Sequence, residues 1–293
     1  MITSKSLPVT VLIAARNESA NMRKCLASCV AAQRVIVVDS ASADGTADIA
    51  MAEGAEVVQF QYTGSYPKKR QWALNELTFD SDWILFLDAD EVIPDELWEE
   101  IRLAIAAPCD YDAFLITKGF HFLGKKFRYG GFSHKAVLLV RKGKGRFEEL
   151  VEVPGDTLDM EVHERIINSG PLGVLKTPLI HEDFKGLEAY IDRHNHYSTW
   201  EAYVRNNWLE SGVYGETSIQ AKLFGNDQQR RRWLKKFVVR MPLEPWIWFV
   251  FHYFWRLGFL EGRPGLVASQ IRRQYIQNVR AKIYEFRHQN GKK

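Results

Sequence analysis

The chain has 293 residues, which is enough to bury a large core without disulfides or metals. Hydrophobic residues make up 46% and charged residues 26%, and this balance excludes a disordered or collagen-like chain. Three cysteines cannot form a disulfide framework, and no Cys-x-x-Cys pair suggests a zinc site. We therefore expect reduced, buried thiols in a cytosolic protein.

Basic residues concentrate near the end of the chain, although the formal net charge is only +3. Residues 226–293 carry 15 Lys or Arg against 4 Asp or Glu, whereas the first 225 residues are net acidic. This asymmetry predicts an extension that binds nucleic acid or anionic lipid. The apolar run 9–15 ends in Arg-Asn-Glu without a cleavage-like site, so we expect no signal peptide and a cytoplasmic location.

Short apolar runs alternate with helical patterns in the first third of the chain. The runs predict strands at residues 9–14, 35–38, 57–60 and 83–87, and the patterns between and after them predict helices at 20–32, 46–53, 67–77 and 94–106. Strands that are apolar on both faces belong to a parallel sheet covered on both sides. The fold class is therefore α/β, with a doubly wound, mostly parallel sheet whose ligands sit at the carboxyl ends of the strands.

Residues 107–225 are mixed, with strands expected at 114–118 and 136–141 and a helix at 187–204. Residues 246–260 are apolar almost throughout and predict one helix of about 22 Å, which is shorter than the hydrocarbon core of a bilayer. Trp and Tyr beside the basic cluster at 230–236 favour a helix lying in a membrane interface. A core helix or a contact between subunits is the alternative.

Polar residues follow several of the predicted strands. Asp88 and Asp90 flank one residue directly after the fourth strand, and carboxylates in this arrangement suit Mg²⁺ or Mn²⁺. Asp39 ends the second strand, where it either accepts a hydrogen bond from a nucleoside or begins an Asx turn before the next helix. Lys68, Lys69 and Arg70 form either a solvated face or a clamp for a diphosphate.

Four segments in this order resemble the nucleotide-binding half of family 2 glycosyltransferases, which have the GT-A fold. They are VTVLIAARNE, VIVVDSASADGT, KKRQWALN and WILFLDADE, and they span about residues 8–106. Later segments around residues 162–164, 178–181, 195–202 and 258–268 are similar to the branch of lipopolysaccharide core glucosyltransferases. The resemblance implies a Rossmann-like nucleotide-binding half and a UDP-sugar donor.

The resemblance also implies which residues form the site. Asp88 and Asp90 would hold a divalent metal, Mn²⁺ or Mg²⁺, and His181 would complete its ligands, although a loop histidine with no such role is equally compatible with the sequence. The residues expected to bind the nucleotide-sugar are Ala15, Asn17, Glu18, Asp39, Lys69, Arg70, Asp88 and Ala89.

One general base is expected for an inverting transfer, because the acceptor hydroxyl must lose a proton as it attacks. Many family members use an Asp of an acidic pair in the second half, and this chain has His163-Glu164 there instead. We predict Glu164 as the base, with His163 as the second candidate.

Two other classes of protein compete with this interpretation. A nucleotidyltransferase acting on a sugar phosphate needs a glycine-rich loop after the first strand, and so does a nicotinamide dehydrogenase. The loop here is Ala-Arg-Asn-Glu and has no glycine, which argues against both. A non-catalytic membrane or nucleic-acid binding protein would not need acidic residues gathered at strand ends.

The sequence therefore predicts an inverting, metal-dependent glycosyltransferase that moves a hexose, such as glucose, to a lipid-linked glycan such as the lipopolysaccharide inner core. Residues 1–225 would form the GT-A domain, with the donor half at about 1–106 and the acceptor half at 107–225. Residues 226–293 would form a helical extension that binds an anionic membrane surface or makes a homo-oligomer. We expect a peripheral protein on the inner face of the cytoplasmic membrane, and no nucleic-acid partner.

Overall fold

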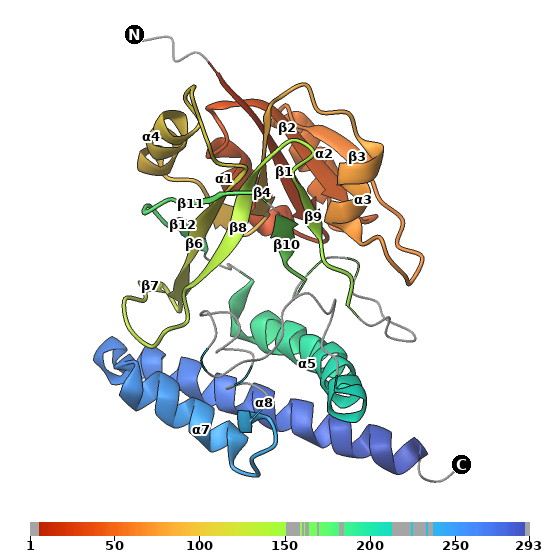
Figure 1. The fold of residues 1–293 in the computed structure, drawn as a ribbon, viewed down its shortest axis with the longest axis vertical. Coiled ribbons are helices and arrows are strands. Elements are labelled where there is room, and N and C mark those ends of the chain that lie inside the picture. Colours follow the sequence, from red (N-terminus) through yellow and green to blue (C-terminus); the bar gives the residue numbers. More distant parts are fainter. Residues whose placement is uncertain are drawn as a thin grey trace. The chain divides into compact units, whose positions relative to one another are not determined.

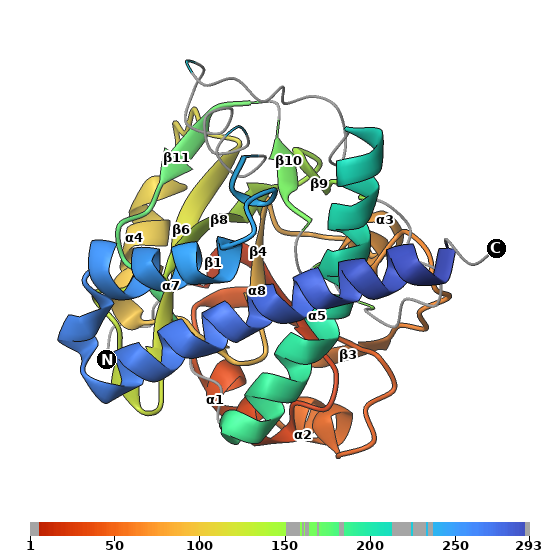
Figure 2. The ribbon, with the colours of Figure 1, turned by 90° about the horizontal axis from the view of Figure 1, so that it is seen from below.

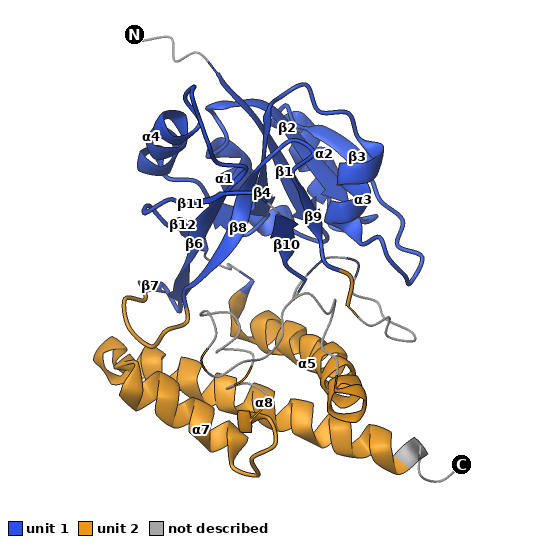
Figure 3. Ribbon diagram, in the orientation of Figure 1, with its two compact units in different colours: residues 1–126, 133–148, 154–185 blue, residues 127–132, 149–153, 186–293 orange. Residues whose placement is uncertain are grey.

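The computed structural model describes residues 6–150, 159, 161, 164–168, 170–181, 185–212, 224, 233 and 237–290. The chain divides into two compact units (Figure 3), each described here by itself. Unit 1 comprises residues 1–126, 133–148 and 154–185, and unit 2 comprises residues 127–132, 149–153 and 186–293. The domain boundary predicted between residues 225 and 226 and the basic cluster at 230–236 lie outside the described residues, except for Trp233.

The first half of unit 1 is a parallel sheet built from the four predicted strands (Figure 1). These are β1 (Leu7–Ala15), β2 (Ala32–Asp39), β3 (Glu56–Gln59) and β4 (Trp83–Asp88). Their order in the sheet is β3-β2-β1-β4, and each neighbouring pair runs parallel. The chain therefore moves outward from β1 to β3 and then returns past β1 to β4.

Helices connect these strands. They are α1 (Ser19–Ala27), α2 (Thr46–Ala52) and α3 (Lys69–Glu76), and α4 (Asp95–Ala104) follows the fourth strand. Because crossovers are right-handed, α1 and α2 cover one face of the sheet and α3 the other. The direction of winding reverses between β1 and β4, which makes the ends of these two strands the topological switch point where ligands of such sheets bind.

The sheet continues beyond β4 with strands of both directions. Antiparallel β8 (His134–Arg141) lies between β4 and β6 (Ala113–Phe122), and β12 (Leu179–His181) runs parallel to β6. The short strand β5 (Glu91–Val92) pairs with β12 at the edge, and the short strands β7 (Lys125–Lys126) and β11 (Leu172–Val174) pair with β6. The strands β9 (Gly145–Phe147) and β10 (Ile166–Asn168) form a separate pair. The α/β fold with a mostly parallel sheet is confirmed.

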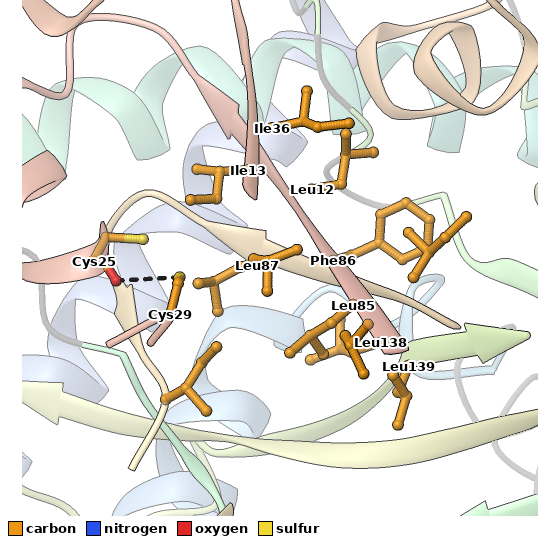
Figure 4. Close-up of a cluster of buried hydrophobic side chains, with 14 of the residues drawn as sticks. Leu12, Ile13, Cys25, Cys29, Ile36, Leu85, Phe86, Leu87, Leu138 and Leu139 are labelled. Atoms are coloured by element: carbon orange, nitrogen blue, oxygen red, sulfur yellow. Dashed lines mark hydrogen bonds between the residues drawn. The ribbon is translucent and has the colours of Figure 1, made fainter. Parts of the chain in front are cut away.

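The core of unit 1 lies on both faces of these strands (Figure 4). Leu12, Ile36 and Leu85 are fully buried, as the apolar runs predicted. Cys25 and Cys29 are buried free thiols in the same cluster, and the Cys29 Sγ donates to the Cys25 carbonyl oxygen at 3.4 Å. Cys109 is also free but only half-buried, because it lies in the connection after α4 rather than under a helix.

Unit 2 is helical, with α5 (Gly186–Ser211), α7 (Glu244–Val250) and α8 (Arg263–Asn290). Figures 1 and 2 both draw α7 alongside α8, and α5 also packs on α8. The helix predicted at 187–204 is confirmed and continues to Ser211. Among the described residues, every helix is too short or too polar to cross a bilayer.

The prediction of one helix over residues 246–260 is wrong. The segment consists of α7, a π-helical turn η1 (Phe251–Trp255) and a 3₁₀ turn η2 (Gly258–Glu261). Leu257 has a φ of 59° and ends the helical run. Gly258 then packs so tightly on the His252 carbonyl that a Cβ would lie 2.6 Å from its oxygen, so glycine is required at this reversal.

Candidate active site

The carboxyl ends of β1, β2 and β4 bring the predicted donor-binding residues to one edge of the sheet. Ala15 is paired with Asp39 on one side, and Ala14 is paired with Asp88 on the other. Asp39 and Asp88 therefore stand at almost the same level on either side of β1. This edge is the switch point defined by the strand order.

The loops after β1 and β2 are fastened to each other. The backbone N–H of Asn17 donates to Ser42 Oγ at 2.8 Å, and Asn17 Oδ1 accepts from the Ala43 N–H at 3.0 Å. The backbone N–H of Glu18 donates to Thr46 Oγ1 at 2.8 Å. Asn17 has a φ of 54°, a left-handed conformation that asparagine tolerates better than most residues. The two loops thus form one rigid rim beside β1.

Asp39 is fully buried and Glu18 partly buried in this rim, and both already have partners. The Asp39 carboxylate accepts from the Ser42 N–H, three residues on, at 3.0 Å and from Gln59 Nε2 at 3.1 Å. It therefore makes a local capping bond to the following loop, one residue longer than the Asx turn offered by the sequence. The Glu18 carboxylate pairs with Lys185 Nζ at 2.5 Å, and burial raises its pKa.

Lys68, Lys69 and Arg70 are buried, so the alternative of a solvated face is wrong. Their exposed fractions are 2%, 1% and 9%. Lys69 Nζ donates to the Ala15 carbonyl oxygen at 2.6 Å, where β1 ends. Burial lowers the pKa of Lys69, while Asp159 at 3.1 Å acts against this. The helix α3 therefore places positive charge at the switch point, where a diphosphate would need it.

Asp88 lies between two cations. Its Oδ1 accepts from the Arg70 guanidinium, and its Oδ2 pairs with Lys118 Nζ at 2.5 Å. Burial acts to raise the pKa of Asp88, but the charges of Lys118 and Arg70 outweigh burial and hold it well below its usual range. Ala89, the next residue, is 3% exposed.

Glu91 and His181 complete an acidic cluster at the end of β4. Glu91 is fully buried, pairs with Lys118 Nζ at 2.9 Å, and accepts from the Asp88 N–H at 2.9 Å. His181 is paired with Glu91 in the β12–β5 ladder, and its Nε2 lies 3.7 Å from Asp90 Oδ2. Burial opposes a charge on His181, but Asp90 and Glu91 outweigh burial and raise its pKa to about 9.

This cluster fits a divalent cation. One ligand atom each from Asp88, Glu91 and His181 lies within 4.8 Å of the others. Carboxylate oxygens are ligands that suit Mn²⁺ or Mg²⁺, and an imidazole nitrogen is a common ligand of divalent transition metals. Of the predicted metal ligands, the structure brings Asp88, Asp90 and His181 to the same edge and adds Glu91, which directly follows the Asp-x-Asp pair in the sequence.

The predicted base Glu164 lies in unit 1 with a fully buried side chain. Its carboxylate accepts from the Tyr66 hydroxyl at 2.7 Å and pairs with Lys68 Nζ at 3.2 Å. Its neighbour in sequence, Glu161, accepts the backbone N–H groups of Arg70 and Gln71 at the start of α3, and burial raises the pKa of Glu161. The second candidate, His163, lies outside the described residues.

Sequence reasoning missed Lys118. It comes from β6, and nothing in its local sequence relates it to the Asp-x-Asp pair, because the long-range pairing of strands brings it there. The Asp159 and Glu161 contacts with the α3 cations were missed for the same reason.

Comparison with known proteins places this site in a family. The model of glycosyl transferase family 2 matches residues 10–159, which is half of the chain. The match covers the ends of β1, β2 and β4, whereas Glu164 and His181 lie beyond it. The chain therefore belongs to glycosyl transferase family 2, and the protein is a glycosyltransferase. The GT-A arrangement and the family resemblance of the sequence are confirmed.

The chain is similar over most of its length to a curated relative from Rhizobium meliloti (strain 1021), the lipopolysaccharide core biosynthesis glycosyltransferase LpsC. The two are 28% identical over 95% of this chain and 93% of the relative. An uncharacterised glycosyltransferase from Rickettsia typhi is 26% identical over 90% of this chain and 82% of its own. The similarity to the lipopolysaccharide core branch is thus also confirmed.

Among solved structures, glucosyl-3-phosphoglycerate synthase from Mycobacterium tuberculosis, in complex with Mn²⁺, UDP and glucosyl-3-phosphoglycerate, matches 40% of this chain and 44% of its own. Its sequence identity is 24% and its TM-score 0.31. Mannosyl-3-phosphoglycerate synthase from Rubrobacter xylanophilus gives 22% identity and a TM-score of 0.32.

Proposed function

We propose that this glycosyltransferase moves a hexose, such as glucose, from a UDP-sugar to a lipid-linked glycan acceptor of the lipopolysaccharide inner core type. The observation that carries the donor site is the meeting of Asp39, Asp88 and the buried cations of α3 at the switch point of the sheet. The acceptor class rests on the similarity to the lipopolysaccharide core relative, which extends over 95% of this chain.

The nucleotide would lie across the end of β1. Asn17, Glu18 and Asp39 form the rim that would accept hydrogen bonds from the nucleoside. Ala15 and Ala89 have small side chains at the ends of β1 and β4, and small residues let a ligand approach the backbone. Lys69 and Arg70 would then face the diphosphate and neutralise its charge.

A divalent cation, Mn²⁺ or Mg²⁺, would be held by Asp90 and His181 with Asp88 or Glu91 beside them. When bound, it would stabilise the negative charge that develops on the leaving diphosphate. Because the pKa of His181 is raised to about 9, this side chain has to release a proton before it can ligate.

Transfer would invert the anomeric carbon in one displacement. The acceptor oxygen forms a bond to that carbon as the bond to the diphosphate breaks, and UDP leaves with the electron pair. Glu164 would take the hydroxyl proton, with His163 as the second candidate. The Glu164 carboxylate is paired with Lys68 Nζ at 3.2 Å, and this pair must open before the carboxylate can reach an acceptor.

We also propose that the protein works in the cytoplasm as a peripheral protein on the inner face of the cytoplasmic membrane. The basic and aromatic residues of 226–293 would bring the active site to its lipid-linked acceptor or join two copies of the chain. Nucleic acid has no part in this function.

Thermal unfolding with nucleotides tests the donor site. UDP, GDP, CDP and NAD are each added with and without Mn²⁺, and saturation at about 100 times the dissociation constant stabilises by about 2.7 kcal/mol. We expect a rise of several degrees with UDP that requires Mn²⁺ and disappears in Asp90→Ala. Arg102→Gln, on the exposed face of α4, is the matched control that keeps the shift. The absence of a shift with every nucleotide contradicts the proposal.

A further inference from the structure

Exposed apolar side chains gather in one short segment of unit 2, residues 243–263, called here the aromatic turn. It contains the end of the segment before α7, then α7, η1 and η2, and the first residue of α8. Nine of its large apolar side chains are exposed, among them Trp255 at 80%, Leu243 at 63% and Phe254 at 54%. Elsewhere in the described chain such side chains are single, as Val30 is, or form smaller groups, such as Leu103, Tyr111 and Val174 around one pocket of unit 1. A concentrated patch marks an interaction surface.

The acidic residues of the aromatic turn point inward. Glu244 is fully buried, and its Oε1 pairs with Arg205 at 2.8 Å. Glu261 is 3% exposed, and its Oε1 accepts the N–H groups of Arg128 at 2.7 Å and Tyr129 at 2.8 Å. The surface of the turn therefore presents no carboxylate.

The charges that remain on this surface are positive. Arg256 and Arg263 are exposed at the end of η1 and the start of α8. The guanidinium of Arg273, on α8, lies 4.2 Å from the centre of the exposed Trp246 ring. His252 adds no charge near neutral pH, because burial lowers its pKa to about 4. The surface of the turn thus combines aromatic and aliphatic side chains with arginines, and both of its glutamates are buried.

We propose that the aromatic turn inserts into the headgroup region of an anionic bilayer. Trp and Phe side chains favour the interface between headgroups and acyl chains, and arginines beside them bind lipid phosphates. A symmetric contact between two copies fits less well, because it would bring like-charged arginines together without acidic partners. The inference deepens the proposed function by naming the surface that holds the enzyme, and it assigns this role to the turn rather than to α8 or the basic cluster before it.

Vesicle sedimentation without donor or acceptor tests the proposal, so its failure is distinct from failure of the donor site. The full chain is mixed with vesicles of phosphatidylcholine alone or with phosphatidylglycerol added. We expect binding that needs phosphatidylglycerol and falls as salt rises from about 0.1 M to about 1 M, where the Debye length shrinks from about 10 Å to about 3 Å.

Two variants locate the contact. Phe254→Ser with Trp255→Ser removes two exposed rings and should weaken vesicle binding about a hundredfold, since each buried aromatic side chain contributes about tenfold. Arg256→Gln with Arg263→Gln should reduce the preference for phosphatidylglycerol about tenfold or more. Tyr284→Ser removes an exposed ring of α8, 69% exposed, and should leave binding unchanged. The unfolding temperature of each variant, measured without ligand, checks that it folds.

Three outcomes overturn the proposal. One is equal binding to both kinds of vesicle. Another is a loss of binding in Tyr284→Ser as large as in the ring variant of the turn. The third concerns the Phe254→Ser, Trp255→Ser variant. If light scattering shows a dimer of the unchanged protein that dissociates in this variant while vesicle binding stays the same, the aromatic turn binds a second copy of the chain and not a membrane.

Discussion

Lys118 Nζ lies 2.5 Å from Asp88 Oδ2 and joins two residues that are 30 positions apart in the sequence. The same ammonium lies 2.9 Å from Glu91 Oε1, so one cation from β6 neutralises two carboxylates of the cluster that would hold a metal. Burial opposes the charge on Lys118, but Asp88 and Glu91 outweigh it and raise the pKa of Lys118. In the absence of metal, Lys118 thus keeps the acidic cluster folded.

Replacing Lys118 by Met should therefore destabilise the metal-free protein and increase its response to metal. Removing one partner of a buried ion pair costs about 3–5 kcal/mol when the other charge is left without compensation. Here Arg70 still pairs with Asp88 and His181 with Glu91, so we expect a cost at or below the lower end of this range. We expect a lower unfolding temperature in chelator and a larger rise with Mn²⁺ than in the unchanged protein. Calorimetry with and without Mn²⁺ measures both.

Lys126→Met is the control for this prediction, since Lys126 is exposed on β7, which pairs with the same strand β6. It should behave like the unchanged protein. Equal Mn²⁺ responses in all three proteins would show that Lys118 and the metal do not share the carboxylates.

The fold could be predicted from the sequence because its information is local. A short apolar run such as 83–87 in a chain of alternating strand and helix patterns favours a strand buried on both faces, and the strand-end rule then placed Asp39 and Asp88 at one edge. Lys118 and the Lys68–Glu164 pair could not be found this way, because distant segments bring them together. The break at Leu257 escaped detection because composition reports apolarity, not backbone direction.

Glu164→Gln should abolish sugar transfer and leave UDP binding intact, because a neutral amide cannot accept the acceptor proton. The substitution also removes the buried Lys68–Glu164 ion pair, so the unfolding temperature is measured beside the activity. A rate near that of the unchanged enzyme would remove Glu164 as the base.

Glu161→Gln serves as the matched control for this test. Its carboxylate accepts backbone N–H groups at the start of α3, so the change should lower stability but keep transfer within about tenfold of the unchanged rate. If both variants lose activity equally, the loss comes from disturbance of α3 and not from a missing base.

His252 should make the protein less stable in acid. Burial lowers its pKa from about 6.5 to about 4, so the unfolded chain binds a proton that the folded chain refuses. The stability it contributes is full above pH 6.5 and is lost as the pH falls from about 6.5 to about 4, by up to about 3 kcal/mol. Its Nδ1 lies 2.6 Å from the Gly130 carbonyl oxygen and its ring stacks on Phe132.

The difference in unfolding free energy between the unchanged protein and His252→Gln, followed with pH, isolates this effect. The carboxylates titrate in both proteins and cancel in the difference. We expect this difference to be constant above pH 7. Between pH 6.5 and 4 the unchanged protein should lose stability relative to His252→Gln, because only the unchanged protein has a histidine at this position to protonate on unfolding. A difference that does not vary with pH would mean that His252 takes up its proton normally in the folded state.

Arg205 is a buried cation of unit 2 that pairs with two carboxylates. Its guanidinium lies 2.6 Å from Glu201 and 2.8 Å from Glu244, and the Glu201 carboxylate also accepts from the Tyr275 hydroxyl. Arg205→Met should lower the free energy of unfolding by about 3–5 kcal/mol, because the buried carboxylates of Glu201 and Glu244 would lose the cation that pairs with both. Arg23→Met, which breaks an exposed pair with Glu53, should cost less than about 1 kcal/mol.

Adding Glu244→Gln to Arg205→Met should recover part of the lost stability, since one buried charge is removed. Urea unfolding of the unchanged protein and the three variants measures this recovery. A double variant no more stable than Arg205→Met would mean that Glu244 carries no uncompensated charge once Arg205 is gone.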